Sequence, residues 1–319
     1  MKNKVMPPWT PMKYSENGNN VTTEMWGRKY ISGDKSFLES VISQGEELLA
    51  GPIRIVETEN GKDIVWGEFT NLLMNDSDEE TVCIVSAAQS EAFLLNVSMK
   101  IEYDGCVDFG LTVAPQGTRP GRVMGYDIGQ KPGYKLTRLW MEIPLKSEVA
   151  KVFHMFPNSD ITVNGKDVEK AGFKQAGEVA DIMQMPFMEQ LFIGNDNVGF
   201  CVFAETDEGR QLDDKKRAVE CIREKDEYIL RIRLLDSEPY NWIEKDVTNG
   251  MNLLPITFRM GFIATPLRPF PENPYKERAV HIDCFKKIPN DMLYDEFLLS
   301  PYEDTDELVI DRIKRLGVN

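Results

Sequence analysis

The clearest pattern in this chain is a series of short apolar runs separated by clusters of turn residues. Residues 186–269 show it best, because one apolar run ends at Asn195-Asp196-Asn197 and the next ends at Thr206-Asp207-Glu208-Gly209. Such polar punctuation predicts strands that are joined by tight turns. A last apolar run, 258–265, stops at Pro266, which cannot donate a hydrogen bond to a sheet. This stretch therefore predicts an antiparallel sheet, and by itself it indicates no chemistry.

The same pattern extends over most of the first 270 residues. After an extended lead-in at 1–20, we expect strands near 21–30, 53–56, 66–73, 81–86, 93–103, 106–113 and 135–145. Residues 219–235 predict two strands that are joined by a turn at 224–227. Hairpin turns are expected at Asn60-Gly61, Asp104-Gly105 and Asn164-Gly165. Residues 115–133 are rich in Gly and Pro and predict a long loop, and 146–180 predict a peripheral excursion. Many short strands with frequent turns are typical of an all-β fold, and we predict a large antiparallel β-sandwich.

The end of the chain follows a different pattern. Asp304-Thr305-Asp306-Glu307 resembles a capping box, and Val309, Ile313 and Leu316 recur at helical spacing. Gly317 then supplies a C-cap, and the two last residues would begin a strand. We therefore expect a β-sandwich domain at 1–272, followed at 273–319 by a linker and a first helix that leads into a further domain. The alternative is a plain C-terminal helix that packs on the sandwich.

Composition and charge narrow the class of function. The chain has 319 residues, a formal net charge of −15 and 42% hydrophobic residues, so it can bury a sizeable core. So acidic a surface repels phosphate backbones and anionic lipids, and roles at nucleic acid or at a membrane are not expected. We see no apolar run near the roughly 20 residues of a membrane helix, and no signal peptide, so the compartment stays open.

The cysteines and histidines predict neither a metal site nor a cofactor site. Five widely spaced cysteines, without a zinc-binding spacing, are expected to be buried free thiols. The only two histidines, His154 and His281, lie far apart in the sequence. A pair of distant imidazoles is a poor basis for a sugar epimerase or for a metal centre. No cofactor is therefore expected.

A set of short motifs spans nearly the whole chain in a fixed order. The set comprises Pro8-Trp9-Thr10-Pro11, Trp26-Gly27-Arg28, residues 45–52, residues 139–145, Gly194-Asn195-Asp196 with residues 203–209, and residues 262–266. The ordered set resembles the N-terminal region of bacterial proteins of the glycoside hydrolase family 123 type.

The resemblance implies a galactose mutarotase-like β-sandwich placed ahead of a catalytic (β/α)8 barrel. It also implies an N-acetylhexosaminide substrate and a parent protein that is exported. In the family, an adjacent Asp-Glu pair on the barrel acts: the Asp orients the substrate's own acetamido group as nucleophile, and the Glu is the general acid. A barrel needs about 250 residues, far more than follow residue 290. No catalytic residue is therefore carried over to this chain, which we expect to be inactive alone.

The acidic dipeptides of this chain are expected to be structural. They are Asp78-Glu79, Asp207-Glu208, Asp226-Glu227, Asp295-Glu296 and Asp306-Glu307. The first three fall in predicted turns and the last opens the predicted helix, where carboxylates face solvent or cap backbone groups. Arg259, beside the last motif, is expected in a salt bridge.

Aromatic residues supply the candidates for ligand binding. Trp26, Trp66 and Trp140 lie in predicted strands and are expected in the core. Tyr240 and Trp242 lie in a polar loop, and exposed rings of this kind can stack on sugars. We therefore predict carbohydrate binding at Tyr240 and Trp242. The expected function is that of a non-catalytic sandwich that supports a barrel in the full-length protein; the alternative is a stand-alone carbohydrate-binding or scaffold module.

Overall fold

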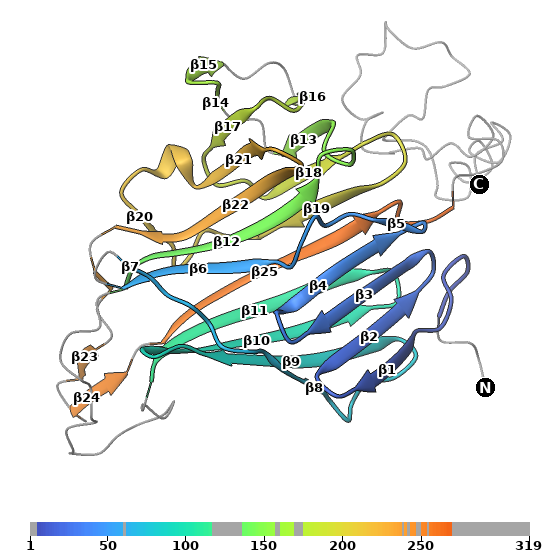
Figure 1. The fold of residues 1–319 in the computed structure, drawn as a ribbon, viewed down its shortest axis with the longest axis horizontal. Coiled ribbons are helices and arrows are strands. Elements are labelled where there is room, and N and C mark those ends of the chain that lie inside the picture. Colours follow the sequence, from blue (N-terminus) through green and yellow to red (C-terminus); the bar gives the residue numbers. More distant parts are fainter. Residues whose placement is uncertain are drawn as a thin grey trace, which may run out of the picture. The chain divides into compact units, whose positions relative to one another are not determined.

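A computed structural model describes residues 5–59, 62–116, 136–156, 160–168, 175–237, 239–240, 243–246, 250–253 and 255–269 (Figure 1). This part of the chain is built from strands in antiparallel sheets, with one short 3-10 helix, η1 (Lys215–Arg217). The predicted fold class, a large antiparallel β-sandwich, is confirmed. The predicted C-terminal helix at 304–317 lies outside the described residues, as does the predicted long loop from residue 117 onward.

The chain begins with a five-stranded meander, which we call the N-terminal sheet. Its strands are β1 (Lys13–Asn17), β2 (Asn20–Met25), β3 (Arg28–Gly33), β4 (Ser36–Ser43) and β5 (Glu46–Glu47). Two expectations were wrong here. The lead-in contains β1, and the single strand expected at 21–30 is a hairpin, because Gly27 takes a positive φ of 64° and turns the chain between β2 and β3.

A nine-stranded sheet, here the β25 sheet, forms one layer of the sandwich. Its strands are, in spatial order, β16 (Gln175–Glu178), β13 (Val152–Phe156), β18 (Gln190–Gly194), β19 (Gly199–Phe203), β25 (Ile256–Thr265), β11 (Cys106–Pro115), β10 (Phe93–Glu102), β9 (Thr81–Gln89) and β8 (Thr70–Leu73). The hairpin of β10 and β11 turns at Asp104-Gly105, as predicted, with Gly105 at a φ of 86°. The region 146–180 is less peripheral than expected, because β13 pairs with β18 inside this sheet.

The second large sheet, here the β12 sheet, contains β15 (Lys166–Val168), β14 (Ile161–Val163), β17 (Ile182–Met185), β21 (Val219–Glu224), β22 (Glu227–Asp236), β12 (Leu136–Lys146), β6 (Arg54–Glu59) and β7 (Lys62–Asp63). The short β20 (Gln211–Leu212) joins its β22 in parallel, and β23 (Ile243–Asp246) and β24 (Gly250–Leu253) form a separate hairpin. The predicted Asn164-Gly165 turn joins β14 and β15, and both of its residues have positive φ. The pairing of β6 with β7 agrees with the hairpin expected at Asn60-Gly61, although those two residues are outside the described part.

The N-terminal sheet and the β12 sheet cover the same face of the β25 sheet. Met260 and Phe262 are two residues apart on β25 and so point to one side. Phe262 packs against Tyr30 of the N-terminal sheet, with ring centroids 5.6 Å apart. Met260 lines a small cavity together with Ile232 of β22. The three sheets share one continuous apolar core, and Figure 1 shows the N-terminal sheet beside the β12 sheet.

Three of the sequence motifs meet at the end of β25. Arg28 is 3% exposed, and its guanidinium donates to the carbonyls of Ala264 and Leu267, each at 3.0 Å. The Trp9 indole donates to the same Leu267 carbonyl at 2.9 Å. The hydroxyl of Tyr30 donates to Gly105 O at 2.8 Å, and burial raises the pKa of Tyr30 to about 12. These motifs therefore join the N-terminal sheet to the sandwich and have a structural role.

The cysteines only partly match expectation. Cys201 and Cys221 are buried free thiols, as predicted, and burial raises the pKa of Cys221 to about 12. Cys83 and Cys106 are also free but only half-buried, because each lies on a strand of the β25 sheet facing away from the core. Cys284 is outside the described part.

The chain divides into two compact units, Met1–Arg268 and Pro269–Asn319. The domain boundary predicted at 272 was argued from the sequence pattern and stays a prediction. Within the described part of the chain, there is no helix with the length and apolar character needed to cross a membrane.

Candidate functional site

The loop between β19 and β20, residues 204–210, separates two cavities. We call them the Arg210 pocket and the Tyr240 pocket. Asp207 and Arg210 line the first, and Glu208 and Gly209 line the second. The turn is fixed by Gly209, with a φ of 82°, and by a hydrogen bond of 3.1 Å from the Arg210 amide to the Asp207 carbonyl. A single turn therefore presents adjacent acidic side chains to two different cavities.

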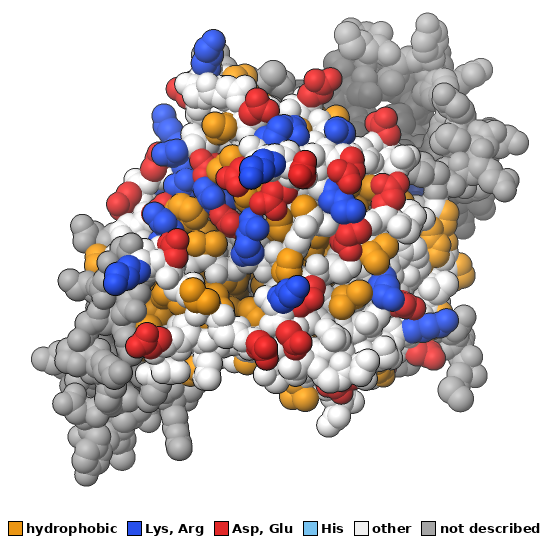
Figure 2. All heavy atoms as spheres, viewed as in Figure 1, with side chains coloured by type: hydrophobic (Ala, Val, Ile, Leu, Met, Phe, Trp, Pro, Cys, Tyr) orange, Lys and Arg blue, Asp and Glu red, His pale blue; other side chains and the backbone are white. Residues whose placement is uncertain are grey.

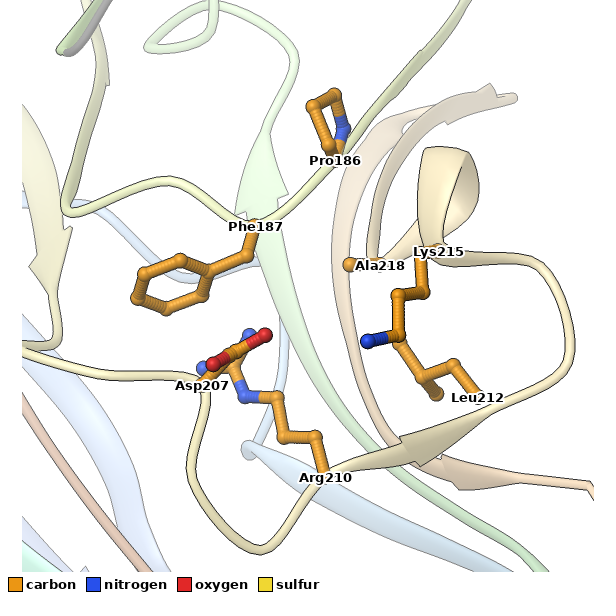
Figure 3. Close-up of a pocket in the computed structure, with 7 residues that line it drawn as sticks. All are labelled: Pro186, Phe187, Asp207, Arg210, Leu212, Lys215 and Ala218. Carbon is orange, nitrogen blue, oxygen red and sulfur yellow. The ribbon is translucent and has the colours of Figure 1, made fainter.

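The Arg210 pocket has a volume of about 280 Å³ (Figure 3). It is lined by Pro186, Phe187, Asp207, Arg210, Leu212, Lys215 and Ala218. The residues come from the segment after β17, from the 204–210 loop, and from β20 and η1. Figure 3 shows the Lys215 ammonium pointing into the pocket, toward the side where the Phe187 ring lies over Arg210 and Asp207. One wall is thus apolar and the other carries charges of both signs.

Arg210 is the unusual residue of this pocket. Its guanidinium carbon lies 4.7 Å from the centre of the Phe187 ring, a cation–π contact. Its Nη1 is buried and has no hydrogen-bond partner within the described part of the chain. Burial lowers the pKa of Arg210 to about 10, and the negative charge of Asp207 works against that shift. The residue stays charged at neutral pH, with a donor that the surrounding protein leaves unsatisfied.

The Tyr240 pocket is larger, about 420 Å³, and its lining combines polar and apolar surface. It is formed by Thr206, Glu208, Gly209, Gln211, Tyr240, Pro255, Ile256, Thr257 and Arg259. The backbone amide of Tyr240 donates to Leu136 O at 3.0 Å, which holds the loop against β12. The ring is half-buried, and this burial raises the pKa of the Tyr240 hydroxyl.

The two predicted carbohydrate-binding residues therefore have different outcomes. Tyr240 lines a cavity, whereas Trp242 lies outside the described residues. The pocket also includes Gln211, Thr257 and Arg259, which the sequence did not suggest as ligand-binding residues. Thr257 and Arg259 are exposed because they occupy alternate positions on β25, facing away from the core. Strand alternation was the signal that could have identified them.

Trp140 was expected in the core, and this expectation was wrong. It lies on the face of the β12 sheet turned away from the core and is only partly buried. Its ring is surrounded by the guanidinium groups of Arg138, Arg231 and Arg233, at 4.4, 4.5 and 4.9 Å. Its neighbours Leu139 and Met141 point into the core, so strand alternation places Trp140 on the opposite face. A bulge between Leu139 and Trp140 also shifts the register against β22.

Carboxylates neutralise this arginine cluster. Glu142 binds Arg231 at 2.7 Å and Arg54 at 3.2 Å, and Glu220 binds Arg231 at 2.9 Å and Arg233 at 3.0 Å. Burial opposes ionisation of Glu220, but hydrogen bonds from Gln184 and Arg233 hold its pKa below the ordinary value. Figure 2 shows this mixed patch of basic and acidic side chains over β12, β22 and β21. We interpret the cluster as structural, because its arginines are paired with carboxylates. Three of its nitrogens, Nε of Arg138 and of Arg233 and Nε1 of Trp140, are buried without a hydrogen-bond partner in the described part of the chain.

The other candidates from the sequence do not gather into a site. The Asp78 carboxylate accepts from the amides of Glu80 and Thr81 and so caps a turn, as predicted, and Asp226 lies in the turn between β21 and β22. His154 is on β13, and His281 lies outside the described part, as do the dipeptides at 295 and 306. Among the residues that the structure describes, there is no group of three or more His, Cys, Asp or Glu arranged to hold a metal ion.

Comparison with known families gives one match. Residues 28–120 match the model described as "Glycoside hydrolase 123, third domain". The resemblance to that family is thereby confirmed for this region, which includes strands β3 to β11. The chain therefore contains a domain region of the kind found in glycoside hydrolases. No curated protein matches the sequence.

Solved structures give distant matches. A galactose 1-epimerase from Lactobacillus acidophilus NCFM is 9% identical with a TM-score of 0.39, and 80% of this chain covers 97% of that chain. The Slr1438 protein from Synechocystis sp. PCC 6803 is 10% identical with a TM-score of 0.43, and the alignment covers 83% of this chain and 99% of the other. An amine oxidase from Aspergillus nidulans is 9% identical with a TM-score of 0.42, covering 84% of this chain and 55% of the other. With similarity this distant and with unrelated activities among the names, no activity is assigned to this chain from them.

Proposed function

We propose that this chain is a non-catalytic sandwich of a glycoside hydrolase, and that it supports a catalytic barrel and contacts the glycan at the Tyr240 pocket. The observation that carries the proposal is the match of residues 28–120 to a glycoside hydrolase 123 domain. The substrate class that follows from the resemblance is an N-acetylhexosaminide.

The Tyr240 pocket supports the carbohydrate part of the proposal by its chemistry. Sugars present many hydroxyl groups together with an apolar C–H face. The pocket offers a half-buried aromatic ring for the C–H face, and Gln211, Glu208 and Thr257 as hydrogen-bonding groups. Its volume of about 420 Å³ is within the range of small-ligand sites.

The alternative is a stand-alone carbohydrate-binding or scaffold module. Of these two modules, the Tyr240 pocket favours the carbohydrate-binding one, because sugar contact there does not need a barrel. The reading frame of the native gene distinguishes the barrel-supporting sandwich from the stand-alone module. A reading frame that continues past Asn319 with alternating strand and helix patterns would favour the barrel-supporting form, and a stop codon at that point would favour the module.

The experiment combines an activity assay with a binding assay on the full chain. We expect no hydrolysis of p-nitrophenyl N-acetylgalactosaminide, and we expect N-acetylgalactosamine to bind in a calorimetric titration. Tyr240→Ala should weaken binding by about tenfold, the equivalent of roughly 1.4 kcal/mol. Tyr14→Ala is the matched control, because Tyr14 is an exposed tyrosine on β1. Turnover by this chain alone, or equal binding by the two variants, would contradict the proposal.

A further inference from the structure

We propose that the Arg210 pocket binds a carboxylate-bearing sugar, with the carboxylate held between the Arg210 guanidinium and the Lys215 ammonium. This site lies on the other side of the 204–210 loop from the Tyr240 pocket, and it does not depend on the proposed function. The argument rests on the placement of Arg210, the balance of charge and the size of the cavity.

The surroundings of Arg210 hold its guanidinium in one place but do not satisfy it. The Phe187 ring covers one face of the guanidinium, with its centre 4.7 Å from the guanidinium carbon. The Arg210 backbone amide donates a hydrogen bond to Asp207 O, which fixes the backbone. Nη1 is buried without a partner in the described part of the chain, and an unsatisfied buried donor costs about 1–3 kcal/mol. A cavity of about 20 Å³ behind Arg210 has room for roughly one water, which would serve one donor. A guanidinium has five N–H donors, so others stay available to a ligand.

The charge of the pocket favours a single negative charge. Among the residues that the structure describes, its lining contains two cations, Arg210 and Lys215, and one carboxylate, Asp207. The pocket thus carries a local excess of one positive charge in a chain whose formal net charge is −15. Figure 3 shows the Lys215 ammonium directed into the space beside Arg210 and Asp207. A ligand carboxylate there would make charge-assisted hydrogen bonds to both cations.

The shape of the pocket favours a ligand of about one sugar ring. The volume of about 280 Å³ is at the lower end for small-ligand sites. Pro186, Leu212 and Ala218 add apolar walls to the Phe187 ring. Apolar walls suit the C–H face of a pyranose, and a sugar acid combines such a face with one carboxylate.

The test is a calorimetric titration of the full chain with sodium glucuronate, with sodium acetate and glucose as separate arms. We expect glucuronate to bind more tightly than either acetate or glucose, and added NaCl to weaken its binding. Lys215→Gln should weaken glucuronate binding by about tenfold, since it removes one charge-assisted hydrogen bond. The matched control is Lys216→Gln, an exposed neighbour on η1 that does not line the pocket, and it should change binding less than about twofold.

Several outcomes would overturn the proposal. They are absence of glucuronate binding, equal affinities for glucuronate and acetate, and equal losses in the two lysine variants. Arg210→Met should abolish glucuronate binding. If that variant does not fold, the Lys215→Gln variant still tests the proposal, because Lys215 is exposed. The two proposals fail separately, because Tyr240→Ala should leave glucuronate binding unchanged and Lys215→Gln should leave N-acetylgalactosamine binding unchanged.

Discussion

Two sets of arginines in this protein are placed against aromatic rings, and they differ in what else surrounds them. On the β12 sheet, Arg231 and Arg233 lie over Trp140 and bind Glu220 at 3.0 Å or less. At the 204–210 loop, Arg210 lies under Phe187, and among the described residues that line its pocket Asp207 is the only one with a carboxylate. The first set is ion-paired with carboxylates, whereas no ion pair of Arg210 is found within the described part of the chain. Each set keeps a buried nitrogen without a hydrogen-bond partner there, Nε of Arg233 and Nη1 of Arg210, so the carboxylate partners make the difference.

The difference separates a structural cluster from a candidate site. Buried charges that are fully paired stabilise one arrangement and offer little to a ligand. A cation that is held in place without a full set of partners is already arranged for an anion. Aromatic and basic residues alone would have pointed to Trp140, and the carboxylate ion pairs of that cluster point instead to Arg210 as the candidate.

The largest loss of unfolding free energy is expected for a substitution at Glu220, in the arginine cluster. Glu220→Ala leaves Arg231 and Arg233 without this carboxylate, and removing one partner of a buried pair costs about 3–5 kcal/mol. Urea unfolding monitored by fluorescence would measure the loss. The control is Glu102→Ala, which breaks an exposed pair with Lys100 and should cost at most about 1 kcal/mol. Similar losses in the two variants would show that the cluster does not act as a buried network.

The second-largest expected effect is on the pH dependence of stability, and it concerns Glu57, a buried acid on β6. It is fully buried on the core face opposite Leu139, and neither carboxylate oxygen has a partner in the described part. Burial raises the pKa of Glu57 well above its ordinary value of 4.5. The folded state therefore holds a proton that the unfolded chain releases, so stability is full below pH 4.5 and falls as pH rises toward the raised pKa.

The expected slope in that window is a loss of about 1.4 kcal/mol per pH unit, on top of the contributions of other groups. Glu57→Gln cannot ionise and should flatten this part of the profile, so the variant gains stability relative to the parent as pH rises. Denaturant unfolding between pH 4.5 and 8 measures both proteins. Parallel profiles would mean that Glu57 is paired or hydrated in the folded state.

The smallest change in unfolding free energy is expected for a substitution of Arg210. Arg210→Met keeps an extended apolar side chain under Phe187 and removes a buried cation with an unsatisfied donor. We expect a change in unfolding free energy within about 1 kcal/mol, because the lost cation–π contact offsets the relief of burial. Arg233→Met should cost more, since it strips a partner from Glu220. Thermal unfolding of both variants measures the difference, and the reverse order would overturn the distinction between the two sets.

Much of the fold could be predicted because its signals are local. Asp104-Gly105 and Asn164-Gly165 are turns whose residues tolerate positive φ, and they fix the hairpins around them. The hairpin at Gly27 was missed because its Trp26-Gly27 turn lacks the Asn or Asp that precedes Gly in the other two turns. The buried positions do change there, from odd-numbered residues in β2 to even-numbered residues in β3. The bulge beside Trp140 was missed because register is a property of two strands, not of one.

The candidate site was predictable only in part. Tyr240 was found because an aromatic residue in a polar loop is visible in the sequence. Thr257 and Arg259 line the same pocket from β25, which lies further along the chain. The interest of Arg210 depends on a hydrogen-bond partner that its Nη1 lacks within the described part of the chain. Absence of a partner is a property of packing, and the sequence does not record it.

The most direct test of the account is a pair of titrations followed by backbone NMR on the full, isotope-labelled chain. N-acetylgalactosamine should shift the amide signals of Gln211, Tyr240 and Thr257, and glucuronate those of Phe187 and Lys215. Shifts confined to these two sets, on opposite sides of the 204–210 loop, are the predicted result. Saturable shifts that cluster around Trp140 on the β12 sheet, or no saturable shifts with either sugar, would contradict it.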